Sequence, residues 1–534
     1  MENYLILNTL SFPILSMLLI VPVIGAIVAM FLRGDTVLKF WGLAVTVVTA
    51  LISLPLWTRF DQTTAKYQFV EFRHWFPALD LDFVVGVDGI SVLLVLLTTL
   101  VMPLCVLCSW TYIKTRWKEF VIVTLLMETA MLGVFVSLNT VLFWIFWEGM
   151  LVPMYLIIAI WGGARKDYAS IKFFLYTFCG SIFLLVAIVA MYIKTGTFFI
   201  PELMAHSFSF SFQVWIFLAC ALGFAIKMPM FPFHTWLPAA HVEAPVAGSV
   251  ILASILLKMG GYGFLRFCLP MAPAATLYFV PLLLVMSLIS IIVGGYLALG
   301  QTDIKKLIAY SSVGHMGFVT LGIFLLNDAG IKGAMLQMLN HGVTTGALFI
   351  LIGIIYERTH SREIADNSKL GMFMPIYVTF LGIFSLSSLA FPGTNSFVSE
   401  FLVLFGAFDK YPLVGAVSIL GAILAAAYML RLLQKMVWDD SNGHVHHGDD
   451  DHGDGKEHKL FDCNAREFIQ LAFLTVFVFW IGLHPTPLLD MMDSSVTHLL
   501  HQIDVGSVVP TEAVQHGESH ALLNNAGAWI KNLF

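Results

Sequence analysis

Charged residues are scarce in this chain, at 12% of its 534 residues, against about 25% in ordinary soluble domains. Hydrophobic residues make up 59% of the sequence, and its mean hydropathy is +0.86. A soluble fold cannot bury that much apolar surface, because its outer layer is rich in polar and charged side chains. The composition therefore excludes a soluble domain and predicts an integral membrane protein.

Motifs that bind redox cofactors are also missing. Of the six cysteines, Cys105 and Cys108 have the spacing of a redox or metal pair, but no second pair completes such a site, so we interpret the cysteines as packing residues. The sequence contains no nucleotide-binding loop, iron–sulfur cysteine cluster or haem motif. Any redox chemistry must therefore take place on other chains, and we expect neither a metal nor a cofactor on this one.

Long apolar runs recur along the chain, each close to the ~20 residues that a helix needs to cross a bilayer. They are continuous rather than alternating, which predicts helices and not the strands of a barrel. The first run lacks a basic flank and a cleavage site, so we interpret it as a retained helix and not a signal peptide. The predicted spans are residues 12–32, 38–57, 90–110, 119–138, 140–161, 171–193, 213–233, 246–268, 277–299, 305–326, 332–356, 373–405, 411–433 and 466–485. The sequence thus predicts an all-α polytopic membrane protein with about fourteen transmembrane helices.

Lysine and arginine are distributed unevenly between the two sets of loops, which predicts the orientation, because cytoplasmic loops are enriched in these residues. The richer set contains Arg33, Lys39, Lys114, Arg116, Lys118, Arg165, Lys166, Lys172, Lys305, Lys306, Arg358, Arg362, Lys369, Arg431 and Lys435. The poorer set includes Arg59, Lys66, Arg73, Lys194, Arg266, Lys332, Lys410 and Lys531. Since an even number of spans places both termini on one side, we expect both termini outside the cytoplasm.

Two polar segments stand apart from the apolar runs. Residues 439–459 are rich in histidine, aspartate and glycine. They could hold a soft divalent ion, but a solvated insertion between helices explains the same composition and is favoured. The tail from about residue 486 to 534 is amphipathic at best, through Val496, Leu499 and Leu500, and could lie on the outer surface or on a neighbouring chain.

Glu148, Lys227 and Lys258 are ionisable residues inside apolar runs. Such residues are expensive in a membrane and usually mark a substrate or ion pathway. Glu148 lies among aromatic residues, so its protonation would respond to any ammonium group that approaches it; a fixed hydrogen bond or ion pair that serves packing is the alternative. Lys258 is too far from the ends of its run to reach the membrane surface, so it should face protein or water. The pattern predicts a protein that moves ions.

Proline breaks accompany two of the buried charges. Lys227 is followed by Pro229 in Lys227-Met-Pro, and Glu400 lies on the same helix as Pro392. Proline removes a backbone donor and clashes with the preceding turn, so we predict that both helices are broken. Freed carbonyls at membrane depth can bind water or protons, as in the discontinuous helices of transporters. A kink that only improves packing is the simpler alternative.

His315 and His341 are the two histidines in the interior of apolar runs. Near the lysines they are candidates for steps of a proton relay, although a hydrogen-bonded core histidine would fit the sequence equally well. Glu128 is a further buried acid, for which structural pairing and transport are equally compatible. We therefore treat Glu128 as a candidate accessory residue, and also His234, which follows the prolines after Lys227.

Several long motifs carry a resemblance to a known family. They are Trp147-Glu148, Lys227-Met-Pro-Met-Phe-Pro-Phe-His234-Thr-Trp-Leu-Pro238, His241-Val-Glu-Ala-Pro245, Asp303-Ile-Lys-Lys306, Ala309-Tyr-Ser-Ser312-Val-Gly-His315 and Asn340-His341-Gly. With these motifs, about residues 85–435 resemble the antiporter-like membrane subunits of respiratory complex I, which are also similar to subunits of multisubunit cation/proton antiporters. Glutamate at position 400 is typical of the M-type (chain 4) branch, whereas most other branches carry lysine there.

The resemblance implies fourteen helices with two inverted five-helix repeats, each with one broken helix, here at Pro229 and Pro392. It divides the chain into residues 1–118 with the first three helices, 119–270 and 271–435 with the two repeats and their half-channels, 436–465 with a His/Asp-rich cytoplasmic loop, and 466–534 with the last helix and an outer tail.

The resemblance also implies roles for the buried residues. Glu148 and Lys227 would form the coupled pair of the first half-channel, and Lys258 would be the central relay. His315 and His341 would extend the path, and the terminal group of the second half-channel would be Glu400.

The implied function is proton translocation as a subunit of an NADH:quinone oxidoreductase in the bacterial inner membrane. FMN, iron–sulfur clusters and quinone would be bound by partner subunits. The expected partners are adjacent antiporter-like subunits, the hydrophilic redox arm and the bilayer, with no nucleic acid. The rival functions are a subunit of a cation/proton antiporter, against which Glu400 weighs, an independent solute transporter, and a structural subunit with fixed ion pairs.

Overall fold

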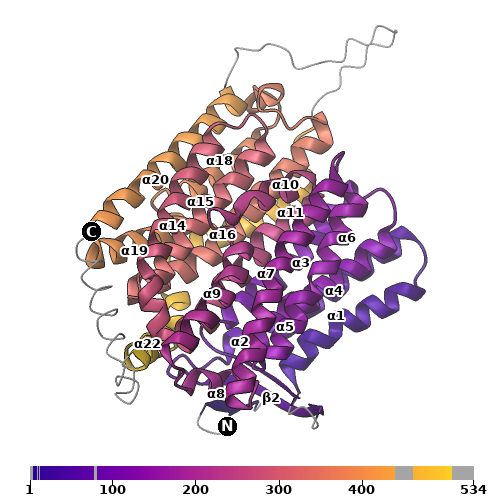
Figure 1. Ribbon diagram of the computed structural model, residues 1–534. Coiled ribbons are helices and arrows are strands. Elements are labelled where there is room, and N and C mark those ends of the chain that lie inside the picture. The colour runs from indigo at the N-terminus through magenta and orange to yellow at the C-terminus, as the bar shows by residue number, and fades with distance from the viewer. Residues whose placement is uncertain (1–3, 9, 11, 77–80, 439–460, 508–534) are drawn as a thin grey trace, which may run out of the picture.

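The computed structural model describes residues 4–8, 10, 12–76, 81–438 and 461–507. They form a bundle of packed helices with a small β-sheet at one end (Figure 1). The His/Asp-rich segment 439–459 and the end of the tail from residue 508, for which the sequence suggested a solvated loop and a surface segment, lie outside the described residues.

The first group of helices comprises α1 (Ile14–Phe31), α2 (Asp35–Thr58), α3 (Val92–Tyr112) and α4 (Trp117–Val136). Helix α1 packs on α2 and α4, and α2 packs on α3. The N-terminus of α1 receives its cap from another element: the Glu71 carboxylate accepts hydrogen bonds from the backbone N–H groups of Leu15 at 2.8 Å and Ser16 at 3.0 Å. A distant acid thus satisfies donors that a helix start leaves free.

The first half of the remaining bundle contains one span in two pieces and one long central span. Helices α5 (Thr140–Gly149) and α6 (Leu151–Trp161) follow each other directly, and α7 (Lys166–Thr195), α8 (Ile200–Ala205), α9 (Phe210–Lys227) and α10 (Trp236–Glu243) come next. The central span consists of α11 (Val246–Ile251), a π-helical turn (Leu252–Leu256), α12 (Leu257–Gly263), a second π-helical turn (Phe264–Cys268) and α13 (Leu269–Met271). This span is fully buried within the bundle.

The second half begins with three long helices, α14 (Pro273–Leu299), α15 (Ile304–Phe324) and α16 (Asp328–Thr359). The short helix α17 (Leu370–Phe373) precedes α18 (Pro375–Ser388), α19 (Asn395–Lys410) and α20 (Pro412–Leu433). Helix α16 packs against α15 and α19. The last described helices are α21 (Ala465–Leu483) and α22 (Thr486–Ser507).

The three-stranded sheet was not predicted from the sequence. It contains β1 (Leu5–Leu7), β2 (Tyr67–Phe76) and β3 (Leu81–Val87) in the order β1-β2-β3, with β1 parallel and β3 antiparallel to β2. We call the end of the bundle that carries this sheet, α8 and α22 the sheet face (Figure 1).

Helix α22 is the part of the tail that the structure describes. Its amphipathic side packs on the bundle, with Val496 and Leu499 buried, and its neighbours include α14 and α16. The tail up to residue 507 therefore lies on this chain's own sheet face.

Both predicted helix breaks are confirmed. Helix α9 ends at Lys227, and the carbonyl of Ile226, near the end of that helix, accepts a hydrogen bond from the Trp236 indole at 2.8 Å. On the far side of that break, the Ser290 hydroxyl accepts from the N–H of Phe231 at 2.8 Å. Helix α18 ends at Ser388 and α19 begins at Asn395, with positive φ angles at Ala390 and Gly393 between them.

The number of membrane spans agrees with the prediction of about fourteen. Within the described ranges, 13 helices are long and apolar enough to cross a membrane, or up to 14 if one bent pair, Ala365–Phe373 with Pro375–Ser388, counts as one span. The predicted run 373–405 corresponds to the two short helices α18 and α19 on either side of the second break.

Basic residues of the richer set gather at the end of the bundle opposite the sheet face. Arg165, Lys305 and Arg362 all approach residues 242–244: Lys305 Nζ donates to the carbonyl of Ala244 at 2.5 Å, and Arg362 to the carbonyl of Val242 at 2.6 Å. We call this end the basic face.

Candidate functional site

Four of the predicted pathway residues lie in one row inside the bundle. They come from four helices: Lys258 from α12, His341 from α16, His315 from α15 and Glu400 from α19. All four are buried, with exposed fractions between 0% and 5%. Ionisable groups at such depth, in contact with one another, have the composition of a proton relay.

The row begins with a direct contact between Lys258 and His341. Lys258 Nζ lies 2.7 Å from His341 Nδ1 and also donates to the carbonyl of Ala253. That carbonyl belongs to the π-helical turn Leu252–Leu256, and such turns are frequent at functional sites. The π-helical turn thus supplies a second acceptor for the Lys258 amine.

A glycine of helix α16 allows this helix to approach the π-helical turn closely. The Ser254 hydroxyl donates to the carbonyl of Gly342 at 2.8 Å. A Cβ at position 342 would lie 2.8 Å from Leu97 and 3.0 Å from the carbonyl of Ser254. The glycine after His341 therefore lets the two helices approach closely enough for the Lys258 contact.

The two histidines form the next step. The ring centroids of His315 and His341 are 5.7 Å apart at an angle of 63°. His341 Nε2 has no hydrogen-bond partner within the described part of the chain. His341 therefore contacts Lys258 through Nδ1, while its Nε2 is available for a further partner.

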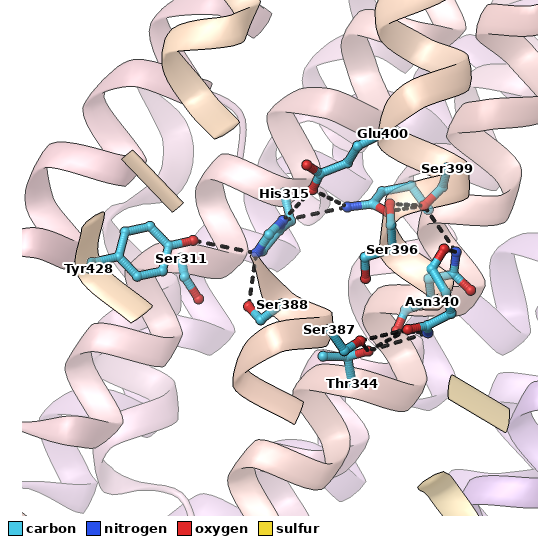
Figure 2. A network of polar contacts seen from close by, with 12 residues as sticks. Ser311, His315, Asn340, Thr344, Ser387, Ser388, Ser396, Ser399, Glu400 and Tyr428 are labelled. Atoms are coloured by element: carbon cyan, nitrogen blue, oxygen red, sulfur yellow. Dashed lines mark hydrogen bonds and ion pairs between the residues drawn. The ribbon is translucent and has the colours of Figure 1, made fainter. Parts of the chain in front are cut away.

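Figure 2 shows the end of the row, where His315 meets Glu400. His315 Nδ1 lies 3.1 Å from Glu400 Oε1, and the Gln337 amide donates to the same oxygen at 3.0 Å. On the other side of the ring, His315 Nε2 lies 3.4 Å from the Ser388 hydroxyl and 3.5 Å from the Tyr428 hydroxyl. Both nitrogens of His315 therefore have polar neighbours, and the ring can accept a proton on one side and donate one on the other.

A second cluster of polar side chains lies beside this site and stabilises the break between α18 and α19 (Figure 2). The Asn340 amide donates to the carbonyl of Asn395 at 2.7 Å and to the Ser399 hydroxyl at 2.9 Å. Ser387 donates to Asn395 Oδ1 at 2.6 Å and lies 2.7 Å from the Thr344 hydroxyl. These bonds fix α19, which carries Glu400, against α16, which carries His341.

Glu148 and Lys227 lie apart from this row. Glu148 is partly buried and accepts a hydrogen bond from Ser181 of α7, while the buried Lys227 amine lies 5.4 Å from the Trp147 ring centroid and 5.8 Å from that of Phe173. Lys227 thus lies against the side chain of the residue that precedes Glu148 in the chain. No hydrogen bond or ion pair joins their side chains within the described ranges, and none joins Lys227 to Lys258.

The two candidate accessory residues also lie outside the row. Both carboxylate oxygens of Glu128 are buried without a hydrogen-bond partner in the described chain. His234 is buried beside the first break, with its ring centroid 5.7 Å from that of Phe231. Neither contacts Lys258, His315, His341 or Glu400 among the described interactions.

The sequence analysis missed His241 as a candidate. Its side chain is 0% exposed, neither ring nitrogen has a hydrogen-bond partner in the described chain, and its ring stacks on Phe349 at 4.6 Å. The available signal was its place in the motif His241-Val-Glu-Ala-Pro245.

A polar cavity of about 150 Å³ opens near His241 at the basic face. Its lining includes Glu243, Lys305, Tyr356, Arg362 and Phe349, the ring on which His241 stacks. His241 therefore adjoins this cavity through the Phe349 ring.

Among the residues that the structure describes, no group of three or more histidine, cysteine, aspartate or glutamate side chains is arranged to hold a metal ion. The histidines of segment 439–459, the one metal-binding alternative that the sequence left open, lie outside those residues.

Comparisons with known proteins identify the family. Residues 137–425 match the family described as NADH:quinone oxidoreductase/Mrp antiporter, TM. The chain is 43% identical to the NADH-ubiquinone oxidoreductase chain 4 of Arabidopsis thaliana, over 95% of this chain and 98% of that protein. It is also 43% identical to the NADH-quinone oxidoreductase subunit M of Rhodobacter capsulatus, over 92% of this chain and 97% of that protein.

The fold is similar to a solved structure as well. A chain in the structure of respiratory complex I from Thermus thermophilus with bound NADH superimposes with a TM-score of 0.80 at 29% identity, over 91% of this chain and 99% of that chain.

Proposed function

The chain belongs to the NADH:quinone oxidoreductase/Mrp antiporter transmembrane family, in its subunit M (chain 4) branch, and we propose that it carries protons along the buried row from Lys258 to Glu400. As a member of that branch it is an antiporter-like, proton-translocating subunit of an NADH:quinone oxidoreductase, complex I. It takes part in the enzyme as a membrane subunit of a translocase.

The observation that carries the proposal is the contact between buried titratable groups on four helices. A proton on Lys258 can pass to His341 Nδ1 across 2.7 Å. One water molecule between the two rings could connect His341 to His315, since both offer nitrogens to it. From His315 the proton reaches Glu400 across 3.1 Å, so that the glutamate is the terminal acceptor.

Glu148 and Lys227 serve a different purpose in this proposal. They are not joined to the row by a hydrogen bond, so they act on it through charge. Lys227 ends the broken helix α9, where a small rearrangement would change its distance from Glu148. Loading or unloading this pair alters the electrostatic potential at Lys258 and so its tendency to release a proton. In the predicted division of the chain, residues 119–270 carry this switch together with Lys258, and residues 271–435 carry the other three members of the row.

The same proposal includes orientation, partners and cofactors. By the positive-inside rule the basic face lies in the cytoplasm and the sheet face outside the bacterial inner membrane. Other membrane subunits flank this chain. FMN, iron–sulfur clusters and quinone belong to partner subunits, where the redox reaction takes place.

A role in a cation/proton antiporter is less well supported. The family description covers both kinds of complex, but the curated relatives at 43% identity are named as oxidoreductase subunits. Glu400, the branch marker, also lies in the row itself.

Purification of the tagged chain in mild detergent tests the assignment. We expect flavin and iron–sulfur subunits to co-purify, together with NADH:quinone reductase activity. Antiporter subunits alone would replace the oxidoreductase with a cation exchanger, and a chain without partners would point to a solitary transporter.

Replacement of the acid of this pair, Glu148→Gln, should lower quinone-dependent turnover and proton uptake together by about fivefold. A fivefold effect corresponds to the lower end of typical coupling free energies between sites. The amide can still accept a hydrogen bond from Ser181, so assembly should be retained. The measurements are NADH oxidation and dye-quench proton uptake in membrane vesicles, with assembly checked on native gels. Unchanged pumping in an assembled complex would contradict a role for Glu148.

A further inference from the structure

A second set of buried polar residues lies along the central span between Lys258 and the sheet face. Lys258, Tyr262 and Arg266 are spaced by four residues along the central span, and each is at most 4% exposed. Residues four apart lie on one side of a helix, so Tyr262 stands between the amine-bearing turn and Arg266. Lys258 and Arg266 are separated by about 12 Å along the helix axis.

Arg266 is held by partners from three elements. Its Nη2 donates to Asp88 Oδ1 at 2.6 Å, its Nη1 to the Tyr67 hydroxyl at 2.7 Å and its Nε to the Tyr262 hydroxyl at 3.3 Å. Asp88 is fixed in turn, because its carboxylate accepts from the N–H groups of Ile90 and Ser91 at the start of α3. The guanidinium thus has one defined position.

A cavity of about 280 Å³ reaches this arginine from the sheet face. Its lining includes Lys66, Tyr67, Asp88, Arg266, Ser495 and His498. Helix α22 covers one side, where the Ser495 hydroxyl accepts from the N–H of Gly89 at 3.0 Å. Two polar side chains, Arg266 and Tyr262, would separate water in this cavity from the amine of Lys258.

We propose that the Arg266–Asp88 pair is a proton barrier that separates Lys258 from this cavity. The proposal rests on the proposed function, because it needs Lys258 to carry protons. A proton wire requires groups that both accept and donate, whereas a guanidinium has N–H donors only and stays protonated. Protons at Lys258 are therefore directed to His341.

Arg266→His tests the barrier, because histidine can accept a proton on one nitrogen and release one from the other. In proteoliposomes that contain the purified complex, we expect passive proton permeability without NADH to rise about tenfold, which corresponds to a barrier lower by about 1.4 kcal/mol. The double variant Arg266→His with Lys258→Met should be tight again, because the leak passes through Lys258. In the single variant Arg266→His, the rate of NADH oxidation with an uncoupler should stay close to that of the unmodified complex.

The matched control is Arg358→His, the same change in another ion pair, in which Arg358 is partly buried and Glu467 is buried. Arg358 donates to Glu467 at 2.7 Å and lies away from Lys258 and the cavity, so it should cause no leak. If Arg266→His does not assemble, Arg266→His with Asp88→Asn keeps the histidine, leaves no carboxylate unpaired and should leak equally. A tight Arg266 variant in an assembled complex overturns the barrier, even where Lys258→Met still stops pumping. Normal pumping by Lys258→Met would instead overturn the proposed function.

Discussion

Lys258→Met is expected to reduce proton pumping by about 10²-fold, because proton transfer through a positioned side chain is typically worth that much or more. Methionine fills a similar volume but offers no proton and no hydrogen bond to His341 or to the carbonyl of Ala253. The row would then begin with a histidine that has lost its donor. Pumping per NADH oxidised, measured by dye quench against oxidation rate in sealed vesicles, is the quantity to follow.

Two further variants separate proton transfer from simple charge. Lys258→Arg keeps the positive charge, but a guanidinium does not release its proton, so it should fail as the methionine variant does. Lys194→Met removes an exposed lysine at the end of α7 and should leave pumping intact. Pumping at the normal ratio in an assembled Lys258→Met complex would rule out Lys258 as an obligatory relay.

The sequence predicted the charged residues of the site better than their contacts. Lys258 and Glu400 could be identified because an ionisable side chain in an apolar run is costly wherever it lies. The contact between Lys258 and His341 joins residues 83 positions apart and depends on a π-helical turn, for which the sequence has no local signal. Which histidine meets which acid is likewise a property of the packing of α15, α16 and α19.

The missed features have physical reasons as well. His241 lies between Pro238 and Pro245 in the sequence, in the short helix α10 and not in a long apolar run. His315 and His341 were selected because they lie inside such runs, so this criterion did not apply to His241. Strands β2 and β3 lie between the predicted spans 38–57 and 90–110, and β1 precedes the first predicted span, so the pattern of long apolar runs gave no signal for the β-sheet. By contrast the helix breaks were predictable, because proline acts on the backbone at its own position.

The energies involved are compatible with an electrostatic coupling mechanism. Moving one charge across 100 mV takes roughly 2.3 kcal/mol. An ion pair at about 4 Å with an effective dielectric constant of 20 interacts by about 4 kcal/mol before desolvation. Separating a buried pair such as His315 with Glu400, or bringing Glu148 and Lys227 together as a pair, is therefore comparable to the work of one proton step.

Glu400→Gln should stop the row at its last step, with a loss of pumping of about 10²-fold. The amide can still accept a hydrogen bond from Gln337, so the helix break and the position of α19 should be preserved. It cannot take up a proton, and it leaves a protonated His315 without a negative partner. The quantity to measure is pumping per NADH oxidised in sealed vesicles, with assembly checked on native gels.

The matched control for this prediction lies on the same helix as His341. Glu357 is a partly buried acid at the end of α16, and it accepts hydrogen bonds from the Thr111 hydroxyl at 2.8 Å and 2.9 Å. Glu357→Gln removes one carboxylate without touching the row and should pump normally. If both variants pump equally well, the proton does not leave through Glu400, and the contact of 3.1 Å between Glu400 and His315 would be structural. If only Glu400→Gln fails while assembly is retained, the acid that marks this branch of the family is also the acid through which the proton leaves the row.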